Sequence, residues 1–391
     1  ICASVLYAGD VLVYDTETDE IVATIPPTEN EAFWMNTTGG DDDTFYLYSS
    51  PGGSVYAYER PSGTLTLLVE SFGQACQIVD GRWLYGIDDQ EYVKYDLVEH
   101  RALLRQQIGE AKDGMAIMCL TSDLEGNIYG PTYINMHLFG YKPSTGKLHD
   151  LGKINRWGGQ GDSISRGRDG RLYIGAYVRA TVNIYDPRKS WQPGEGPDAN
   201  PRCYGPIGEG QYRTRCIEHG PDGMVYIGSV PSYNSAPTGA FTRLDPVTGE
   251  KRIWIDMVPG GAVNKMASDD RYVFCAGGGR FFAYDTVTQQ KSFETQLAVS
   301  ALAATPDGHI VCSVADELRV LDPSSMEFVR EIAAPTGALT DMIAAPNGKL
   351  YGINAASIVE IGPTTWTVRQ IAGEGGSFLA ADADSNLYFA R

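Results

Sequence analysis

A short phrase recurs along this chain at intervals of about 40 residues: a strand ending in Tyr-Asp or Leu-Asp, often followed by Pro and a Thr-Gly turn. Clear copies begin at Tyr14, Tyr95, Tyr141, Tyr185, Leu244, Tyr284 and Leu321, and degenerate copies begin at Tyr58 and Ile361. A period of this length is typical of architectures with one supersecondary unit per repeat. The phrase constrains the fold more than any other feature, although it does not define a function.

The repeat at residues 212–256 shows what one unit contains. Short alternating or apolar runs, bounded by Gly, Pro and Asp, predict four strands at 212–219, 224–228, 240–244 and 251–255. Each repeat is therefore predicted to be a four-stranded antiparallel meander, and a ring of such blades is a β-propeller. Packing between blades would bury both faces of each one, which explains apolar runs such as Leu172-Tyr173-Ile174.

We expect an all-β chain with a single β-propeller domain over residues 1–391. The C-terminus carries the first two strands of a repeat, at 377–383 and 386–390, and the N-terminus carries the last two, at 11–14 and 21–25. These terminal strands are predicted to form one composite blade that closes the ring. Eight complete repeats plus this blade favour nine blades, and eight remain possible if one repeat is not a true blade.

Composition narrows the possible partners. The net charge of −18 repels nucleic acid and anionic membranes, and no apolar run approaches the ~18 residues that span a bilayer. We therefore expect neither a nucleic-acid partner nor membrane insertion. The chain begins at Ile1, so either a targeting segment was removed or this is a fragment, and we favour a secreted or periplasmic location. The sequence does not specify an oligomeric state.

The meander defines which loops share a face. The short Asp-Gly and Asp-Pro-x-Thr-Gly turns lie on one face and are interpreted as structural. The loops between second and third strands lie on the other face, and they are longer in three consecutive repeats, at 132–137, 176–180 and 230–239. Because neighbouring inter-blade segments are polar and basic, we predict a ligand pocket on this face.

The predicted pocket combines Arg, whose planar fork suits carboxylates, with Tyr and Trp, whose flat faces suit sugar rings. The candidate substrate-binding residues are Arg179, Arg213, Arg215, Tyr133, Tyr233, Asn234, Trp157, Arg166 and Lys265. The candidate catalytic residues are His137, Tyr177 and Tyr212, which can exchange protons with a substrate. The plainer interpretation is that these loops are only longer and solvated, with their side chains packed on neighbours. No Cys-x-x-Cys or Cys/His cluster suggests a metal, and we expect no cofactor.

The phrase from Asp245 to Trp254 resembles repeats of the pyrroloquinoline-quinone-like bacterial propellers. Those quinone enzymes need a calcium-binding acidic set and a cysteine pair, and this sequence shows neither. In residue types and blade placement the pocket is similar to propeller polysaccharide lyases and their rhamnosidase-like relatives, which act on uronic-acid-containing glycans. Those enzymes commonly have seven blades.

The lyase resemblance implies β-elimination on an acidic oligo- or polysaccharide. Arg179 and Arg213 would neutralise the uronate carboxylate, while His137 and Tyr177 would serve as base and acid. The alternative is a non-catalytic ligand- or protein-binding propeller scaffold. A sugar hydrolase is a third option, but it needs two carboxylates about 5 to 10 Å apart, and Asp162 is the only obvious acid on this face.

Overall fold

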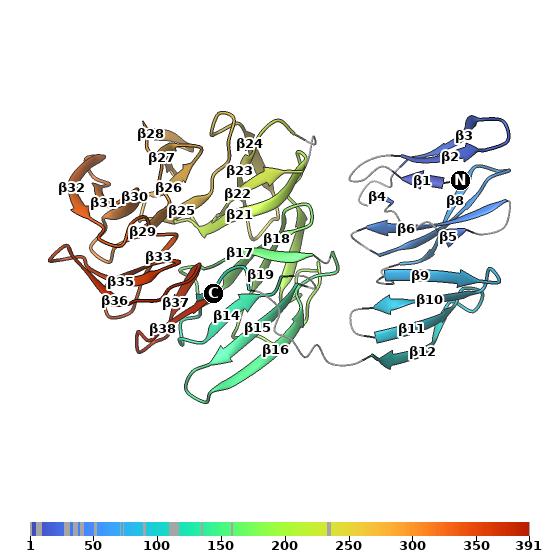
Figure 1. The fold of residues 1–391 in the computed structure, drawn as a ribbon, viewed down its shortest axis with the longest axis horizontal. Coiled ribbons are helices and arrows are strands. Elements are labelled where there is room, and N and C mark those ends of the chain that lie inside the picture. The colour runs from blue at the N-terminus through green and yellow to red at the C-terminus, as the bar shows by residue number, and fades with distance from the viewer. Residues whose placement is uncertain are drawn as a thin grey trace. The chain divides into compact units, whose positions relative to one another are not determined.

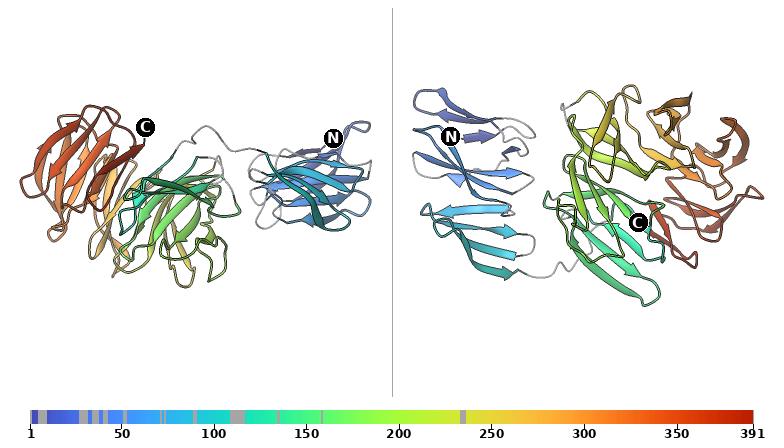
Figure 2. Two further views of the ribbon diagram at one scale, coloured as in Figure 1. Left: turned by 90° about the horizontal axis from the view of Figure 1, so that it is seen from below. Right: turned by 180° about the vertical axis from the view of Figure 1, so that it is seen from behind.

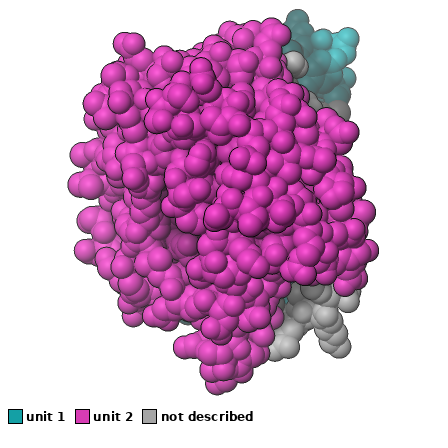
Figure 3. Space-filling model, turned by 90° about the vertical axis from the view of Figure 1, so that its left-hand side faces the viewer, with its two compact units in different colours: residues 1–114, 156–158 teal, residues 115–155, 159–391 magenta. Residues whose placement is uncertain are grey.

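The computed structural model describes residues 2–4, 10–26, 32–33, 38–39, 43–50, 53–70, 72, 74–88, 91–108, 117–133, 136–157, 159–232 and 236–390. The chain divides into two compact units, one of residues 1–114 and 156–158, and one of residues 115–155 and 159–391 (Figure 3). Every regular element in the described ranges is a β-strand, which confirms the all-β prediction. Those ranges contain no helix long and apolar enough to cross a membrane.

Unit 1 contains three antiparallel sheets (Figure 1). The first sheet is β1 (Cys2–Ser4), β2 (Val11–Asp15) and β3 (Glu20–Ile25). The second is β4 (Ala32–Phe33), β5 (Thr38–Gly39), β6 (Thr44–Ser50), β7 (Val55–Glu59) and β8 (Thr64–Val69), in which β4 and β5 both pair with β6. The third is β9 (Gln74–Val79), β10 (Trp83–Asp88), β11 (Glu91–Asp96) and β12 (Arg101–Gln107).

Unit 2 contains six four-stranded antiparallel sheets and a final two-stranded sheet. Their strands, in chain order, are β13 (Thr121–Ser122), β14 (Ile128–Pro131), β15 (His137–Lys142), β16 (Lys147–Lys153); β17 (Gln160–Arg166), β18 (Leu172–Tyr177), β19 (Thr181–Tyr185), β20 (Arg202–Pro206); β21 (Gln211–His219), β22 (Val225–Pro231), β23 (Ala240–Leu244), β24 (Lys251–Ile255); β25 (Lys265–Ser268), β26 (Tyr272–Gly277), β27 (Arg280–Asp285), β28 (Gln290–Gln296); β29 (Ala301–Ala304), β30 (Ile310–Val314), β31 (Glu317–Asp322), β32 (Glu327–Ala333); β33 (Asp341–Ala344), β34 (Leu350–Asn354), β35 (Ser357–Gly362), β36 (Thr367–Ala372); and β37 (Phe378–Ala381), β38 (Leu387–Ala390).

The recurring phrase forms the turn between the third and fourth strands of a sheet. In the turn after β23, Asp245 Oδ1 accepts hydrogen bonds from the backbone N–H groups of Val247, at 2.7 Å, and Thr248, at 3.2 Å. Gly249 closes this turn with φ of 81°, a conformation that glycine adopts without steric cost. Asp285 Oδ1 accepts from Val287 and Thr288 in the same way. The structural interpretation of these turns is confirmed.

Sheets stack through side chains that alternate between two faces. Leu172 and Ile174 of β18 pack in one core cluster with Leu138 of the preceding sheet. Tyr173, between them, packs in another cluster with Val225 of the following sheet. Full burial of such a side chain contributes roughly 1.5–3 kcal/mol, so the packing between sheets is a main source of stability.

The innermost strands of unit 2 follow one another in a circuit (Figures 1 and 2). Each innermost strand contacts the next one, in the order β13, β17, β21, β25, β29, β33 and β37. The last of these strands, β37, also contacts the first, β13. Between the ends of this circuit, the rings of Tyr141 in β15 and Tyr388 in β38 lie 5.8 Å apart. Unit 2 therefore has the blade arrangement of a propeller, with β37 and β38 as its shortest sheet.

The sheets agree with the predicted repeats. Eight sheets of four or five strands correspond to the eight complete repeats, and β1–β3 and β37–β38 correspond to the two partial ones. The single domain over residues 1–391 and the composite blade both require strands of unit 1 to join strands of unit 2, and these two points stay predictions.

Candidate functional site

Two tyrosines and an arginine gather where β18 ends and β21 begins. Tyr177 is the last residue of β18, and Tyr212 and Arg213 are near the start of β21. The rings of Tyr177 and Tyr212 meet edge to face, with centroids 4.9 Å apart at an interplanar angle of 83°. Arg213 Cζ lies 4.0 Å from the Tyr177 ring centroid, within cation–π range. We call these three residues the tyrosine–arginine cluster. The cluster brings together two predicted catalytic residues and one predicted substrate-binding arginine.

Two irregularities of strand pairing help to place the cluster. The register of β17 against β18 skips Asp162, and the register of β21 against β22 skips Tyr212. An extra residue in one strand bends it and re-aims the side chain. Because such a bulge depends on how two strands pair, neither displacement is apparent from the alternation of the sequence.

Arg213 is held by groups of its own protein. Its Nη1 donates hydrogen bonds to Gln160 Oε1, at 3.0 Å, and to Asp162 Oδ1, at 3.3 Å. The Asp162 side chain is only 6% exposed, and burial raises the pKa of Asp162 to about 6, against the opposing effect of Arg213 and Arg215. The cluster therefore contains an arginine that already has a carboxyl partner.

His137 has an acidic partner of its own. It begins β15, and its Nδ1 lies 2.8 Å from Asp150 Oδ2 on the neighbouring strand β16. The imidazole is 13% exposed, so most of its surface is covered. A carboxylate in this position orients the imidazole ring. The catalytic role assigned to His137 stays a prediction.

Three other predicted cations lie along the inner strands of unit 2. Lys265 Nζ donates to the carbonyl oxygen of Thr340, at 2.7 Å, and Arg215 is exposed. Arg166 Nη1 donates to the carbonyl oxygens of Ser122, at 3.3 Å, and Asp123, at 2.9 Å. Arg166 thus links the start of one sheet to the start of the next, which is a structural contact.

The remaining predicted residues have varied positions. Tyr133 is 40% exposed, and Arg179 has a positive φ of 61° in the turn after β18. Trp157 is buried, belongs to unit 1, and lies 4.8 Å from Arg156 Cζ. Tyr233 and Asn234 lie outside the described residues. Their roles in substrate binding stay predictions.

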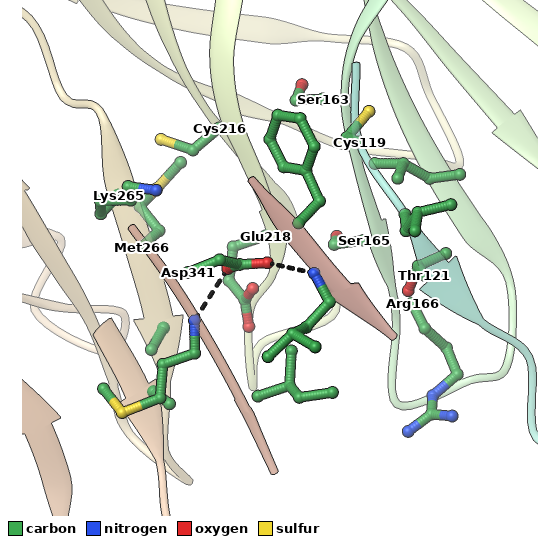
Figure 4. A pocket seen from close by; sticks show the side chains of 18 of the residues that line it. Cys119, Thr121, Ser163, Ser165, Arg166, Cys216, Glu218, Lys265, Met266 and Asp341 are labelled. Atoms are coloured by element: carbon green, nitrogen blue, oxygen red, sulfur yellow. Dashed lines mark hydrogen bonds between the residues drawn. The ribbon is translucent and has the colours of Figure 1, made fainter. Parts of the chain in front are cut away.

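The innermost strands of unit 2 enclose a central channel with a cavity of about 420 Å³ (Figure 4). Asp162 and Arg215 line it together with Lys265, so the tyrosine–arginine cluster adjoins this channel through the Arg213–Asp162 contact. A cavity of this size is within the range of small-ligand sites. We define the channel as the space lined by β13, β17, β21, β25, β29, β33 and β37.

Sequence reasoning missed two carboxyl groups in the channel, Glu218 and Asp341 (Figure 4). Ser268 donates to Glu218 Oε1 at 2.7 Å, and burial raises the pKa of Glu218 to about 7. Asp341 accepts from the backbone N–H groups of Met342 and Leu379, both at 2.9 Å, and burial raises its pKa too. The sequence signal for both is an acidic residue within the first strand of a repeat, outside the loops that carry the predicted pocket.

The channel also contains thiols, but their surroundings do not favour nucleophilic chemistry. Cys119 and Cys216 line it, and burial raises the pKa of Cys216 to about 12 and that of Cys119 well above its usual value. A thiol of this kind stays protonated at neutral pH. Across the described ranges, no group of His, Cys, Asp and Glu is arranged to hold a metal ion.

Comparison with known proteins gives the fold alone. No protein-family model matches the sequence, and no curated protein matches it. Among solved structures, the chain is similar to one in a crystal structure of the mitotic checkpoint complex, with a TM-score of 0.54 and 14% sequence identity. The match covers 73% of this chain and 93% of the other.

Together with its antiparallel sheets, this similarity supports a multi-bladed β-propeller fold. At such low identity the similarity carries no activity or ligand across. The resemblances to quinone-type propellers and to propeller lyases stay predictions.

Proposed function

We propose that this chain is a non-catalytic binding propeller, and that unit 2 binds an acidic partner through the tyrosine–arginine cluster and the adjoining Arg215 and Lys265. Tyr and Arg are the residue types that most often dominate binding energy at interfaces. The matched chain comes from a multi-protein complex, which is compatible with a binding role for the fold. The overall charge of −18 makes this local group of cations the natural place for an anionic ligand.

The observation that carries the proposal is the position of Arg213 on the Tyr177 ring, where Gln160 and Asp162 hold the guanidinium in place. A β-elimination lyase needs a cation that neutralises the substrate carboxylate and so acidifies the adjacent carbon. Here the guanidinium that lies on the Tyr177 ring already shares its charge with Asp162. This arrangement supports a rigid binding surface better than a catalytic one.

The lyase remains a second candidate. It is favoured by the position of Tyr177 and Tyr212, two possible proton-transfer groups, beside Arg213. Its substrate would be an acidic, uronic-acid-containing glycan. The two candidates share the ligand chemistry and differ in whether the ligand is cleaved.

One experiment separates them. The protein is incubated with a panel of uronic-acid polysaccharides, and both binding and the ultraviolet absorbance of an unsaturated product are followed. We expect binding to at least one member of the panel without any rise in absorbance. Arg213→Ala should weaken that binding at least tenfold, because it removes the cation on Tyr177.

Arg252→Ala is the matched control, since Arg252 also covers an aromatic ring, that of Trp254, at 4.7 Å in β24. This variant should bind like the wild type. A rise in absorbance would establish the lyase instead. If no acidic polysaccharide binds, or if both variants weaken binding equally, the assignment of an acidic partner to the cluster is wrong.

A further inference from the structure

Arg213 has one charged contact and two neutral ones. Its Nη1 donates to Asp162 Oδ1 at 3.3 Å and to Gln160 Oε1 at 3.0 Å, and its Cζ lies 4.0 Å from the centroid of the Tyr177 ring. The Arg213 side chain is 34% exposed, whereas that of Asp162 is 6% exposed. A partner in solution can therefore reach the arginine, but the buried carboxylate already offsets its charge.

The Asp162 carboxylate has few groups that stabilise its charge. Its Oδ1 accepts the bond from Arg213, and its buried Oδ2 has no hydrogen-bond partner among the described residues. A carboxylate that loses its hydration needs hydrogen bonds on both oxygens to compensate. Burial accordingly raises the pKa of Asp162 to about 6, against the opposing effects of Arg213 and Arg215. Asp162 is therefore mostly ionised at pH 8 and mostly protonated at pH 5.

The position of Asp162 depends on an irregular strand pair. The pairing of β17 with β18 passes from Gly161 to Ser163 and skips Asp162. Such a bulge re-aims a side chain, and bulges are frequent beside functional sites. The displaced residue meets a guanidinium of the next sheet, on β21. Packing between two sheets thus sets this carboxyl against the tyrosine–arginine cluster.

The rest of the channel lining responds to acid in the same direction. Besides Asp162 and Arg215, the charged residues of the lining are Arg166, Lys265, Glu218 and Asp341. Burial raises the pKa of Glu218 to about 7 and also raises that of Asp341, while arginine side chains stay charged throughout this range. The thiol of Cys119, on which Asp162 also acts, stays protonated because burial raises its pKa well above the usual value. A fall in pH therefore makes the channel and the adjoining cluster more positive.

We propose that Asp162 competes with the acidic partner for Arg213, and that protonation of Asp162 makes the guanidinium available to that partner. This inference rests on the proposed function and assigns the same site a preference for acidic conditions. Protonation cancels the carboxylate charge without dismantling the site, because Gln160 and the Tyr177 ring hold Arg213 through neutral groups. At higher pH the protein supplies its own counter-charge, and the partner binds more weakly.

The test measures the affinity of the full chain for sodium alginate and for sodium polygalacturonate by isothermal titration calorimetry, at pH 5.5 and pH 8 and at constant ionic strength. Both polymers stay ionised, since carboxyls next to an electron-withdrawing group have pKa values of roughly 3.5. We expect the wild type to bind about tenfold more tightly at pH 5.5 than at pH 8.

Asp162→Asn should bind about fivefold more tightly than the wild type at pH 8, because it removes the competing charge and keeps the side-chain shape. At pH 5.5 the two proteins should bind equally, since Asp162 is then mostly protonated in the wild type. Asp198→Asn is the matched control, because Asp198 is an exposed acid of the same unit and its replacement changes the net charge by the same amount. This variant should bind like the wild type at both pH values.

The outcomes separate this inference from the proposed function. If a polymer binds but Asp162→Asn and the wild type have equal affinities at pH 8, the competition is wrong and the acidic partner stands. An equal gain in Asp198→Asn would also refute the competition, as a general effect of charge. A wild-type affinity that does not rise at pH 5.5 would overturn it without reference to any variant. If neither polymer binds at either pH, the proposed function fails and this inference fails with it.

Discussion

At the scale of the residue, the pKa of a carboxyl group is lowered at one position of this chain and raised at another. Asp285, in a copy of the recurring phrase, is held ionised because Arg271 lies 2.6 Å away and backbone N–H groups donate to it, which lowers its pKa. Glu218, within an inner strand, has no such cation, and burial raises its pKa to about 7. The acidity of a carboxyl thus depends on its partners and not on its residue type.

Glu218 should make the stability of unit 2 depend on pH. Its folded-state pKa of about 7 exceeds its usual value of 4.5, so the folded state keeps a proton that the unfolded state releases. Its contribution is complete below pH 4.5 and is lost as the pH rises to 7. Through this group, the unfolding free energy of the wild type should fall by roughly 2–3 kcal/mol between pH 5 and pH 8. Glu218→Gln should not show this part of the decrease.

Urea denaturation of the wild type and Glu218→Gln at both pH values measures this difference. Glu250→Gln should keep the wild-type dependence, since Glu250 is exposed. Parallel pH profiles for the wild type and Glu218→Gln would show that burial does not shift this carboxyl.

At the scale of the element, glycines set how closely sheets approach. Gly228 lies within β22, and a Cβ built there would lie 2.2 Å from the carbonyl oxygen of Val263, in the segment that leads to the next sheet. Backbone cannot move aside as a flexible side chain can. The packing of β22 therefore requires the absence of a side chain, which the apolar pattern of Val225–Ile227 does not indicate.

Gly228→Ala should destabilise unit 2 by about 1–3 kcal/mol, the usual cost of inserting a methyl group into a packed interior. The melting temperature measured by circular dichroism should fall. Gly196→Ala is the matched control, because nothing lies within 4 Å of a Cβ at that position and its φ is not positive. Equal melting temperatures for the two variants would refute the close approach.

At the scale of the whole molecule, the innermost strands of unit 2 form a circuit that uses no strand of unit 1. β37 contacts both β33 and β13, and Asp341 of β33 accepts a hydrogen bond from Leu379 of β37. A complete circuit leaves no innermost strand of unit 2 without a neighbour on either side. This arrangement makes unit 2 a candidate for independent folding.

We expect residues 115–391 to fold when expressed without residues 1–114. The fragment should be monodisperse, rich in β-structure by circular dichroism, and unfold in one cooperative transition. Limited proteolysis of the full chain should also release a stable fragment of this size. An aggregated or unfolded fragment would support the predicted single domain over residues 1–391, in which the N-terminal strands are needed to close the ring.

Much of the fold could be predicted from local signals. Phrase residues such as Asp245 and Gly249 specify a turn through bonds within five residues, and the alternation around Leu172 specifies a strand buried on both faces. The candidate site was predicted in part: Tyr177, Tyr212 and Arg213 do lie together. The partner of that arginine, Asp162, was noted only as a possible catalytic acid.

The sequence by itself determined the repeating strands, the turns that join them and the all-β class, because turn chemistry and two-residue alternation act between near neighbours. Only the tertiary structure decided that Asp162 meets Arg213, 51 positions along the chain, and that Glu218 and Asp341 share one channel. Those contacts depend on two strand bulges and on the circuit of inner strands. Both are set by packing between sheets, which local sequence does not encode.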